Sequence, residues 1–101
     1  MMVDMQKLTD QELQEQLSSL PGWSLKGGKL HRELKFSDFV HAFGFMATAA
    51  IAIEANNHHP EWSNVYNRVT IDLTTHDAGG ITGKDVELAK KLSSLAEKLG
   101  A

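Results

Sequence analysis

The chain contains no cysteine, only two prolines, and no large excess of charge of either sign. Without cysteine it can form no disulfide, no thiolate nucleophile and no zinc–thiolate site. Lysine and arginine number 10 against 13 aspartates and glutamates, so the net charge is −3 and no concentrated positive surface for direct nucleic-acid binding is expected. Absence of cysteine fits a reducing compartment, and we expect a cytoplasmic protein.

Long apolar runs are also missing. The longest one, residues 43–53, contains Gly44 and Thr48 and is far shorter than the roughly 20 residues needed to cross a bilayer. Residues 1–7 include Asp4 and lack an apolar segment, so we expect neither a signal peptide nor membrane association. The 101 residues predict a single domain, 1–101, with a flexible start over 1–7.

The apolar periodicity that is present predicts an α+β fold. We expect helices over about 9–20, 38–55 and 82–99, and strands over 23–25, 30–36, 62–66 and 69–74. Thr9 with Glu12 has the spacing of a capping box, as does Thr82 with Asp85. The order helix, two strands, helix, two strands, helix predicts a four-stranded antiparallel sheet covered on one face by helices. Asn67-Arg68 is the expected turn of the second strand pair.

The helix over 38–55 carries two apolar stripes. The first comprises Phe39, Val40, Phe43, Met46, Ala47, Ala50, Ile51 and Glu54, and the second comprises Ala42, Phe45, Ala49, Ala52 and Ile53. Packing on one sheet needs only one stripe, so the alanine-rich one indicates another helix or a second subunit at close approach. Surface alanines that merely favour helix formation are the alternative, and we favour the subunit contact.

Three of the five histidines lie at the expected ends of secondary-structure elements. His58 and His59 lie between the second helix and the third strand, and His76 follows the fourth strand. Because the start of one antiparallel strand lies beside the end of its partner, these segments should meet at one end of the sheet. Histidine is also the side chain that exchanges protons near neutral pH, with an unperturbed pKa of about 6.5.

Three interpretations of this histidine set compete. The residues could be structural or solvated, with His58 capping the helix. They could form a three-histidine metal site, although adjacent histidines usually point in different directions and a carboxylate such as Asp77 would have to help. They could also perform metal-free general acid–base catalysis, which typically contributes about 10² to 10⁴-fold in rate.

The ordered set of residues resembles the signature of the pterin-4a-carbinolamine dehydratases. The matching positions are Glu54, His58-His59-Pro60, Tyr66, His76 and Asp85, within a resemblance that extends over about residues 23–92. A bare His-His-Pro would be a weak signal, whereas the complete ordered set is highly specific. The resemblance implies a four-stranded antiparallel sheet with three helices on one face and no metal or bound cofactor.

The same resemblance implies dehydration of 4a-hydroxytetrahydropterin to quinonoid dihydropterin and water, in support of tetrahydrobiopterin recycling. An acid and a base must flank the C4a–N5 bond, because hydroxide leaves poorly unless it is protonated. By this resemblance, His58 and His76 would form the acid–base pair, and His59 would mainly position the pterin. Which of the two acts on which stereoisomer stays open.

Further residues are expected to bind the pterin. The complete substrate-binding set is Glu54, Asn57, His58, His59, Trp62, Thr74, Thr75 and His76. Within it, the backbone of Thr74-Thr75 would bind the ring, while Trp62 would wall the pocket or belong to the core. Asp85 is left out because its position at the start of a helix explains it, and His31 and His41 are expected to be solvated.

Two departures from the family pattern and one alternative function follow from the resemblance. Asn57 stands where some members carry aspartate, and Ala78 where animal members have cysteine. Animal members also act as dimerisation cofactors of a homeodomain transcription factor, through the long helix that mediates self-assembly. The alternative is therefore an oligomerisation module, and we expect a homodimer or homotetramer through the helix over 38–55 and the sheet edges.

Overall fold

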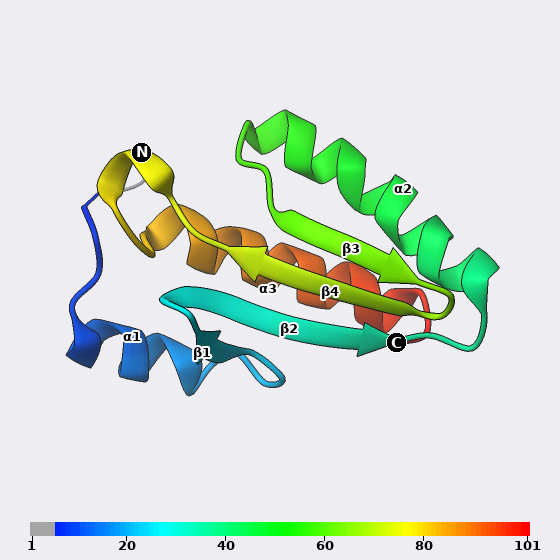
Figure 1. Ribbon diagram of the computed structural model, residues 1–101, viewed down its shortest axis with the longest axis horizontal. Helices are drawn as coiled ribbons and strands as arrows, with labels where there is room; N and C mark the ends of the chain where they lie inside the picture. The colour runs from blue at the N-terminus through cyan, green and yellow to red at the C-terminus, as the bar shows by residue number, and fades with distance from the viewer. Residues whose placement is uncertain (1–5) are drawn as a thin grey trace.

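A computed structural model describes residues 6–101 (Figure 1). The elements, in chain order, are α1 (Asp10–Leu17), β1 (Ser24–Lys26), β2 (Lys29–Lys35), α2 (Phe39–Asn56), β3 (Glu61–Val65), β4 (Arg68–Leu73), the short 3₁₀ helix η1 (His76–Ala78) and α3 (Gly83–Lys98). This order confirms the predicted α+β fold. The expected flexibility of residues 1–7 falls mainly on residues 1–5, which lie outside the described part of the chain.

The sheet is antiparallel throughout, in the order β1-β2-β4-β3. Successive side chains point to opposite faces of a strand, so Val69, Ile71 and Leu73 of β4 lie on one face and are buried. The opposite face carries Thr70 and Asp72, which are only partly covered. The sheet therefore has one face in the core and one polar face.

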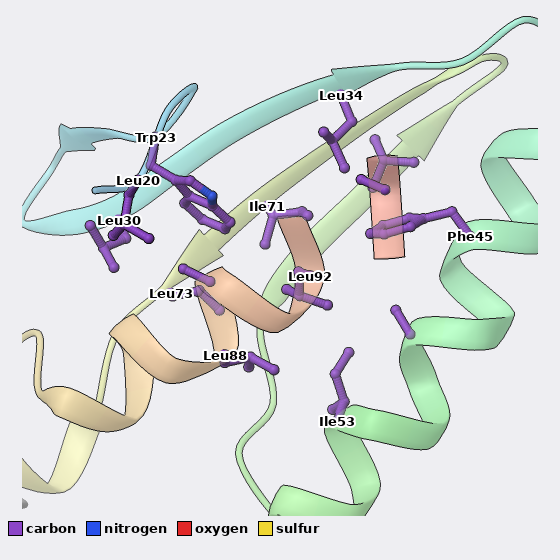
Figure 2. Close-up of a cluster of buried hydrophobic side chains, with 14 of the residues drawn as sticks. Leu20, Trp23, Leu30, Leu34, Phe45, Ile53, Ile71, Leu73, Leu88 and Leu92 are labelled. Atoms are coloured by element: carbon purple, nitrogen blue, oxygen red, sulfur yellow. The ribbon is translucent and has the colours of Figure 1, made fainter. Parts of the chain in front are cut away.

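A single hydrophobic core joins the sheet to all three helices. Figure 2 shows Ile71 and Leu73 of the sheet close to Leu88 and Leu92 of α3, with Phe45 of α2 at the same cluster. Every one of these side chains is at most 3% exposed. The N-terminal segment joins through Leu13 of α1, Leu20 and Trp23, so the predicted placement of the helices over one face is confirmed.

Local chemistry sets the ends of the helices. Thr9 and Thr82 form the two capping boxes predicted for α1 and α3. Asp38, and not Ser37, caps α2, by accepting a hydrogen bond from the backbone N–H of His41 at 2.8 Å. At the other end of α2, Asn57 adopts the left-handed conformation (φ 49°) that asparagine tolerates better than most residues.

The second hairpin turns one residue earlier than predicted. Val65 pairs with Arg68, so the two loop residues are Tyr66 and Asn67, and not Asn67-Arg68. Tyr66 has a φ of 51°, and the Asn67 side chain donates to the Phe36 carbonyl at 3.0 Å. This tertiary hydrogen bond reaches Phe36, just beyond the end of β2, so local turn preferences cannot predict it.

The predicted roles of the two α2 stripes are reversed. The alanine-rich stripe faces the core, where Ala42 and Ala49 are fully buried and small side chains let α2 approach α3 and the sheet closely. The other stripe is exposed: Val40 and Ile51 each expose 74% of their surface, and Phe43 exposes 56%. The prediction that another helix packs closely on the alanine-rich stripe was correct, and that helix is α3. The stripe that remains exposed for a further partner is the one with the large side chains.

Within residues 6–101, α2 is the one helix long and apolar enough to span a membrane by length and composition. Its apolar character has a local explanation, because one side of the helix packs in the core and the other carries the bulky stripe. A helix that is apolar on both sides needs a cover on both sides.

Candidate functional site

The segments that carry the three histidines meet at one end of the sheet, as the antiparallel pairing of the expected strands predicted. Glu61 at the start of β3 pairs with Asp72 near the end of β4. Figure 1 shows the C-terminal end of α2, the start of β3 and the beginning of α3 at this same end of the molecule. Side-chain hydrogen bonds then tie these segments to one another.

The strongest of these ties joins His58 to Asp85. Nε2 of His58 donates to Oδ1 of Asp85 over 2.5 Å, and the Asp85 side chain is fully buried while that of His58 is 13% exposed. A carboxylate on one ring nitrogen holds the imidazole in a single orientation and tautomer. The other nitrogen, Nδ1, has no partner within the described chain, and no buried side-chain nitrogen or oxygen there is unpaired, so Nδ1 faces solvent.

Asp85 is held by a network of its own. Its Oδ2 accepts from the Thr75 hydroxyl at 2.8 Å and from the Thr82 backbone N–H at 2.9 Å. The Thr82 hydroxyl lies 2.9 Å from that of Thr75, which completes the chain of hydrogen bonds. Asp85 therefore caps α3, as its spacing from Thr82 predicted, and the same carboxylate also holds His58, which was not predicted. Asp85 is the last residue of the ordered family signature, which was a reason to consider it for the site. Its capping spacing from Thr82 offered a sufficient structural explanation instead.

His59 points to a different hollow. Its Nε2 lies 3.0 Å from Oε1 of Glu54, and both side chains are largely exposed. A cavity of about 300 Å³ is lined here by His59, Glu54, Pro60 and Trp62, among others. Trp62 is half-buried: it lines this cavity and also packs against the core.

His76 pairs with a third carboxylate. Its Nε2 lies 3.3 Å from Oε2 of Glu61, and its side chain is 80% exposed. Glu61 also accepts from the Lys29 ammonium group at 2.5 Å, and this hydrogen bond is the main reason that the pKa of Glu61 lies below its usual value. Each of the three histidines thus has its own acidic partner.

One of the predicted binding residues, Thr75, is already engaged within the protein. The backbone N–H of Thr75 donates to the Gly80 carbonyl at 2.9 Å, and its hydroxyl donates to Asp85, so Thr75 has no free donor for a ligand. Thr74 is half-buried and forms no such bridge. Asn57 is exposed at the end of α2, where its backbone is left-handed.

The expectation of a solvated His31 was wrong. His31 is 8% exposed and lies between two carboxylates, with Nδ1 2.8 Å from Asp72 and Nε2 3.1 Å from Glu33. The hydrogen bond to Asp72, followed by that to Glu33, raises the pKa of His31 above 6.5. Cross-strand pairing brings Asp72 to His31, whereas Glu33 lies two residues along the same strand. His41 is exposed as predicted, and its Nδ1 lies 2.7 Å from Asp38.

A second and larger cavity adjoins His58. It has a volume of about 400 Å³ and lies between the end of α2 and the first half of α3. Its lining residues are Asn56, His58, Lys84, Glu87, Leu88, Lys90 and Lys91. The side chain of His58 therefore lines a hollow of ligand size. No sequence pattern pointed to the lysines of α3.

Chemically, the arrangement provides oriented imidazoles beside two hollows. His58 can accept or donate a proton at Nδ1 while Asp85 stabilises the charge that this creates. His59 and His76, each beside an exposed carboxylate, can bind or exchange protons with a ligand that lies at this end of the sheet. Within residues 6–101, no three histidine, aspartate or glutamate side chains are arranged to hold a metal ion.

The comparisons with known proteins agree on one family. The sequence model described as pterin 4 alpha carbinolamine dehydratase matches residues 6–95. A protein of Solibacter usitatus (strain Ellin6076), provisionally named as a pterin-4-alpha-carbinolamine dehydratase, is 64% identical over 89% of this chain and 95% of its own. A similarly named protein of Rhodopseudomonas palustris (strain BisB18) is 47% identical over 92% of this chain and 94% of its own.

Two solved structures are also similar to this chain. The crystal structure of a transcriptional coactivator/pterin dehydratase from Brucella melitensis has a TM-score of 0.86 and 46% identity, covering 89% of this chain and 98% of that one. A pterin dehydratase-like protein identified as a RuBisCO assembly factor of the alpha-carboxysome has a TM-score of 0.61 and 20% identity, over 73% of this chain and 86% of its own. The second likeness concerns the fold alone.

Proposed function

Because this chain belongs to the pterin-4a-carbinolamine dehydratase family, we propose that it dehydrates 4a-hydroxytetrahydropterin to quinonoid dihydropterin and water. The observation that carries the proposal is the His58–Asp85 pair: Asp85 holds one imidazole nitrogen, and His58 lines a cavity of ligand size. A solvated or merely capping histidine would not need a fully buried carboxylate behind it. The reaction would take place in the cytoplasm and support tetrahydrobiopterin recycling.

The reaction breaks the C4a–O bond and the N5–H bond and forms the C4a=N5 double bond. The electron pair of the N5–H bond forms the new double bond, and its proton passes to a base. The electron pair of the C4a–O bond leaves with the oxygen, which takes a proton from an acid and departs as water. One group must therefore be deprotonated and another protonated at the same pH, which a pair of imidazoles can provide.

We assign these roles to His58 and His76. His58 accepts or donates at Nδ1, and Asp85 keeps its Nε2 protonated in either state. His76 is exposed at the same end of the sheet, where Glu61 orients it. His59 contacts the pterin from the side of the neighbouring hollow, which Trp62 also lines, and Glu54 orients His59 there. Asp85 is a positioning residue, since it acts through His58.

The test is direct observation of carbinolamine decay. An aromatic amino acid hydroxylase generates the carbinolamine, and its ultraviolet absorbance is followed with and without the protein. We expect acceleration by wild-type protein, and a fall in kcat of about 10² to 10⁴-fold in His58→Ala and in His76→Ala. His41→Ala, an exposed histidine on the far end of α2, is the control and should keep full activity. A wild-type protein that gives no acceleration rejects the proposal.

The exposed stripe of α2 favours a second role in self-assembly. Phe39, Val40, Phe43 and Ile51 are large apolar side chains that are 47 to 74% exposed on one helix. Continuous apolar surface of this kind marks an interaction site. We propose that two or more copies associate through it, as a homodimer or homotetramer. Whether the same stripe also binds a transcription factor, as the alternative function holds, is tested by activity and assembly without any partner.

A further inference from the structure

The cavity beside His58 has an unusual charge. Its walls include Lys84, Lys90 and Lys91 of α3, against the single acidic side chain of Glu87. The whole chain has a net charge of −3, so this positive lining runs against the overall balance. Asp85 does not line the cavity; it is fully buried and already hydrogen-bonded to His58.

None of these lysines is neutralised. Within residues 6–101, Lys84, Lys90 and Lys91 form no ion pair, although Lys91 lies one helical turn beyond Glu87, at a spacing that commonly forms one. Lys29 shows the contrast, because its ammonium group is paired with Glu61. Three unpaired ammonium groups around one hollow leave a site that an anion would complete.

The spacing of the lysines along α3 is comparable to the length of a substrate side chain. Lys84 and Lys91 are seven residues apart, about 10 Å along the helix axis. His58 lines the same cavity, so a ring whose reacting atoms lie at His58 can extend a substituent toward Lys90 and Lys91. The volume of about 400 Å³ falls within the range of small-molecule sites.

Resting on the proposed dehydratase function, we infer that this cavity receives an anionic substituent, a phosphate or a carboxylate, carried on the side chain of the pterin substrate. Lysine ammonium groups bind either group through charge-assisted hydrogen bonds. The inference names a substrate class: pterins with a charged side chain are preferred over those with a neutral hydroxylated one.

The test compares three pterins by fluorescence titration in low salt: 7,8-dihydroneopterin, its 3′-phosphate, and dihydrofolate, which carries glutamate carboxylates. The protein variants are K90Q/K91Q and, as a control with the same change in charge, K35Q/K98Q, which alters exposed lysines outside the cavity. We expect wild-type protein to bind at least one anionic pterin about tenfold more tightly than the neutral one, equivalent to about 1.4 kcal/mol. This preference should weaken in about 0.5 M salt, because salt screens exposed charges.

In K90Q/K91Q the preference should fall to about twofold or less, while binding of the neutral pterin is retained and K35Q/K98Q behaves as wild type. Loss of preference for the phosphate alone, or for dihydrofolate alone, identifies which anion the lysines bind. Equal affinities in the wild type, or a preference that survives in K90Q/K91Q, overturns the inference. Binding and dehydration of the neutral pterin without any preference would reject the inference alone, whereas absence of pterin binding and of dehydration would reject the proposed function as well.

Discussion

The Nε2 atom of His58 and the Oδ1 atom of Asp85 are 2.5 Å apart, although the two residues are 27 positions apart in the chain. One carboxylate thereby closes the N-terminus of α3 and orients an imidazole from the end of α2. Catalytic geometry and the start of a helix depend on the same side chain. A substitution at this position should consequently affect stability and activity in separable ways.

Asp85→Asn is the first prediction. The amide keeps the size of the side chain but loses the charge that stabilises a protonated His58, so we expect kcat to fall about 10-fold or more. The buried hydrogen bonds from Thr75 and Thr82 weaken as well, at a cost of about 1–3 kcal/mol in the free energy of unfolding. Urea unfolding and the pH profile of kcat measure the two effects. Asp77→Asn, an exposed neighbour in η1, is the control, and an unchanged pH profile in D85N would contradict the positioning role.

His59→Ala is the second prediction, and it separates binding from chemistry. If His59 positions the pterin, its loss raises KM by about tenfold and leaves kcat nearly unchanged, whereas loss of His58 lowers kcat. Glu54→Gln should show a weaker form of the same effect with little change in stability, because exposed ion pairs contribute about 0–1 kcal/mol. Steady-state kinetics across a range of pterin concentrations decide this. A fall in kcat with KM unchanged would place His59 in the acid–base step instead.

The third prediction concerns the pH dependence of stability at His31. Its pKa is raised above 6.5 in the folded state by Asp72 and Glu33, so the protonated form is stabilised by folding. The contribution is fully present below the unfolded pKa of about 6.5 and is lost as the pH rises through the higher folded value. The difference in unfolding free energy between wild type and His31→Gln should therefore be larger at about pH 6 than at about pH 9.

Urea titrations at several pH values check this expectation. Asp72→Asn removes the principal cause of the raised pKa and should flatten the pH dependence of that difference. A difference that is constant, or that grows with pH, would contradict the assignment.

The fourth prediction addresses the exposed stripe of α2. Replacing Val40 and Phe43 by glutamate should convert an oligomer into a monomer in sedimentation experiments, because a charge in an apolar contact remains unpaired. Both side chains are more than half exposed, so the monomer itself should change in stability by only about 0.5 kcal/mol or less. Ser94→Glu, at an exposed position of α3 away from the α2 stripe and the sheet edges, is the control. A wild-type protein that sediments as a monomer at all concentrations would refute the assembly.

Much of this architecture was predictable because its causes are local. Capping boxes at Thr9 and Thr82 appear in the sequence as residue pairs three positions apart. Alternation of apolar residues marked β4, and Gly27-Gly28 marked the first hairpin through the positive φ that both residues adopt. Each of these signals depends only on residues close together in the chain, so it can be read from the sequence.

Other features depend on which segments meet in space. The stripe of α2 that faces the core was predicted the wrong way round, because both stripes are apolar and only packing against α3 and the sheet selects the smaller side chains. His31 is another example: its carboxylate partner Asp72 lies 41 positions away on a paired strand.

The sequence by itself determined the order and type of the elements, the end of the sheet at which the histidine segments meet, and the resemblance to a dehydratase family. Only the tertiary structure decided that Asp85 serves His58, that Thr75 is already engaged, and that three lysines of α3 surround the adjoining cavity. The physical reason is the sequence separation over which each kind of interaction acts. Backbone propensity and capping act over a turn of chain, whereas a hydrogen-bonded pair or a lined cavity exists only after distant segments have packed against the same core.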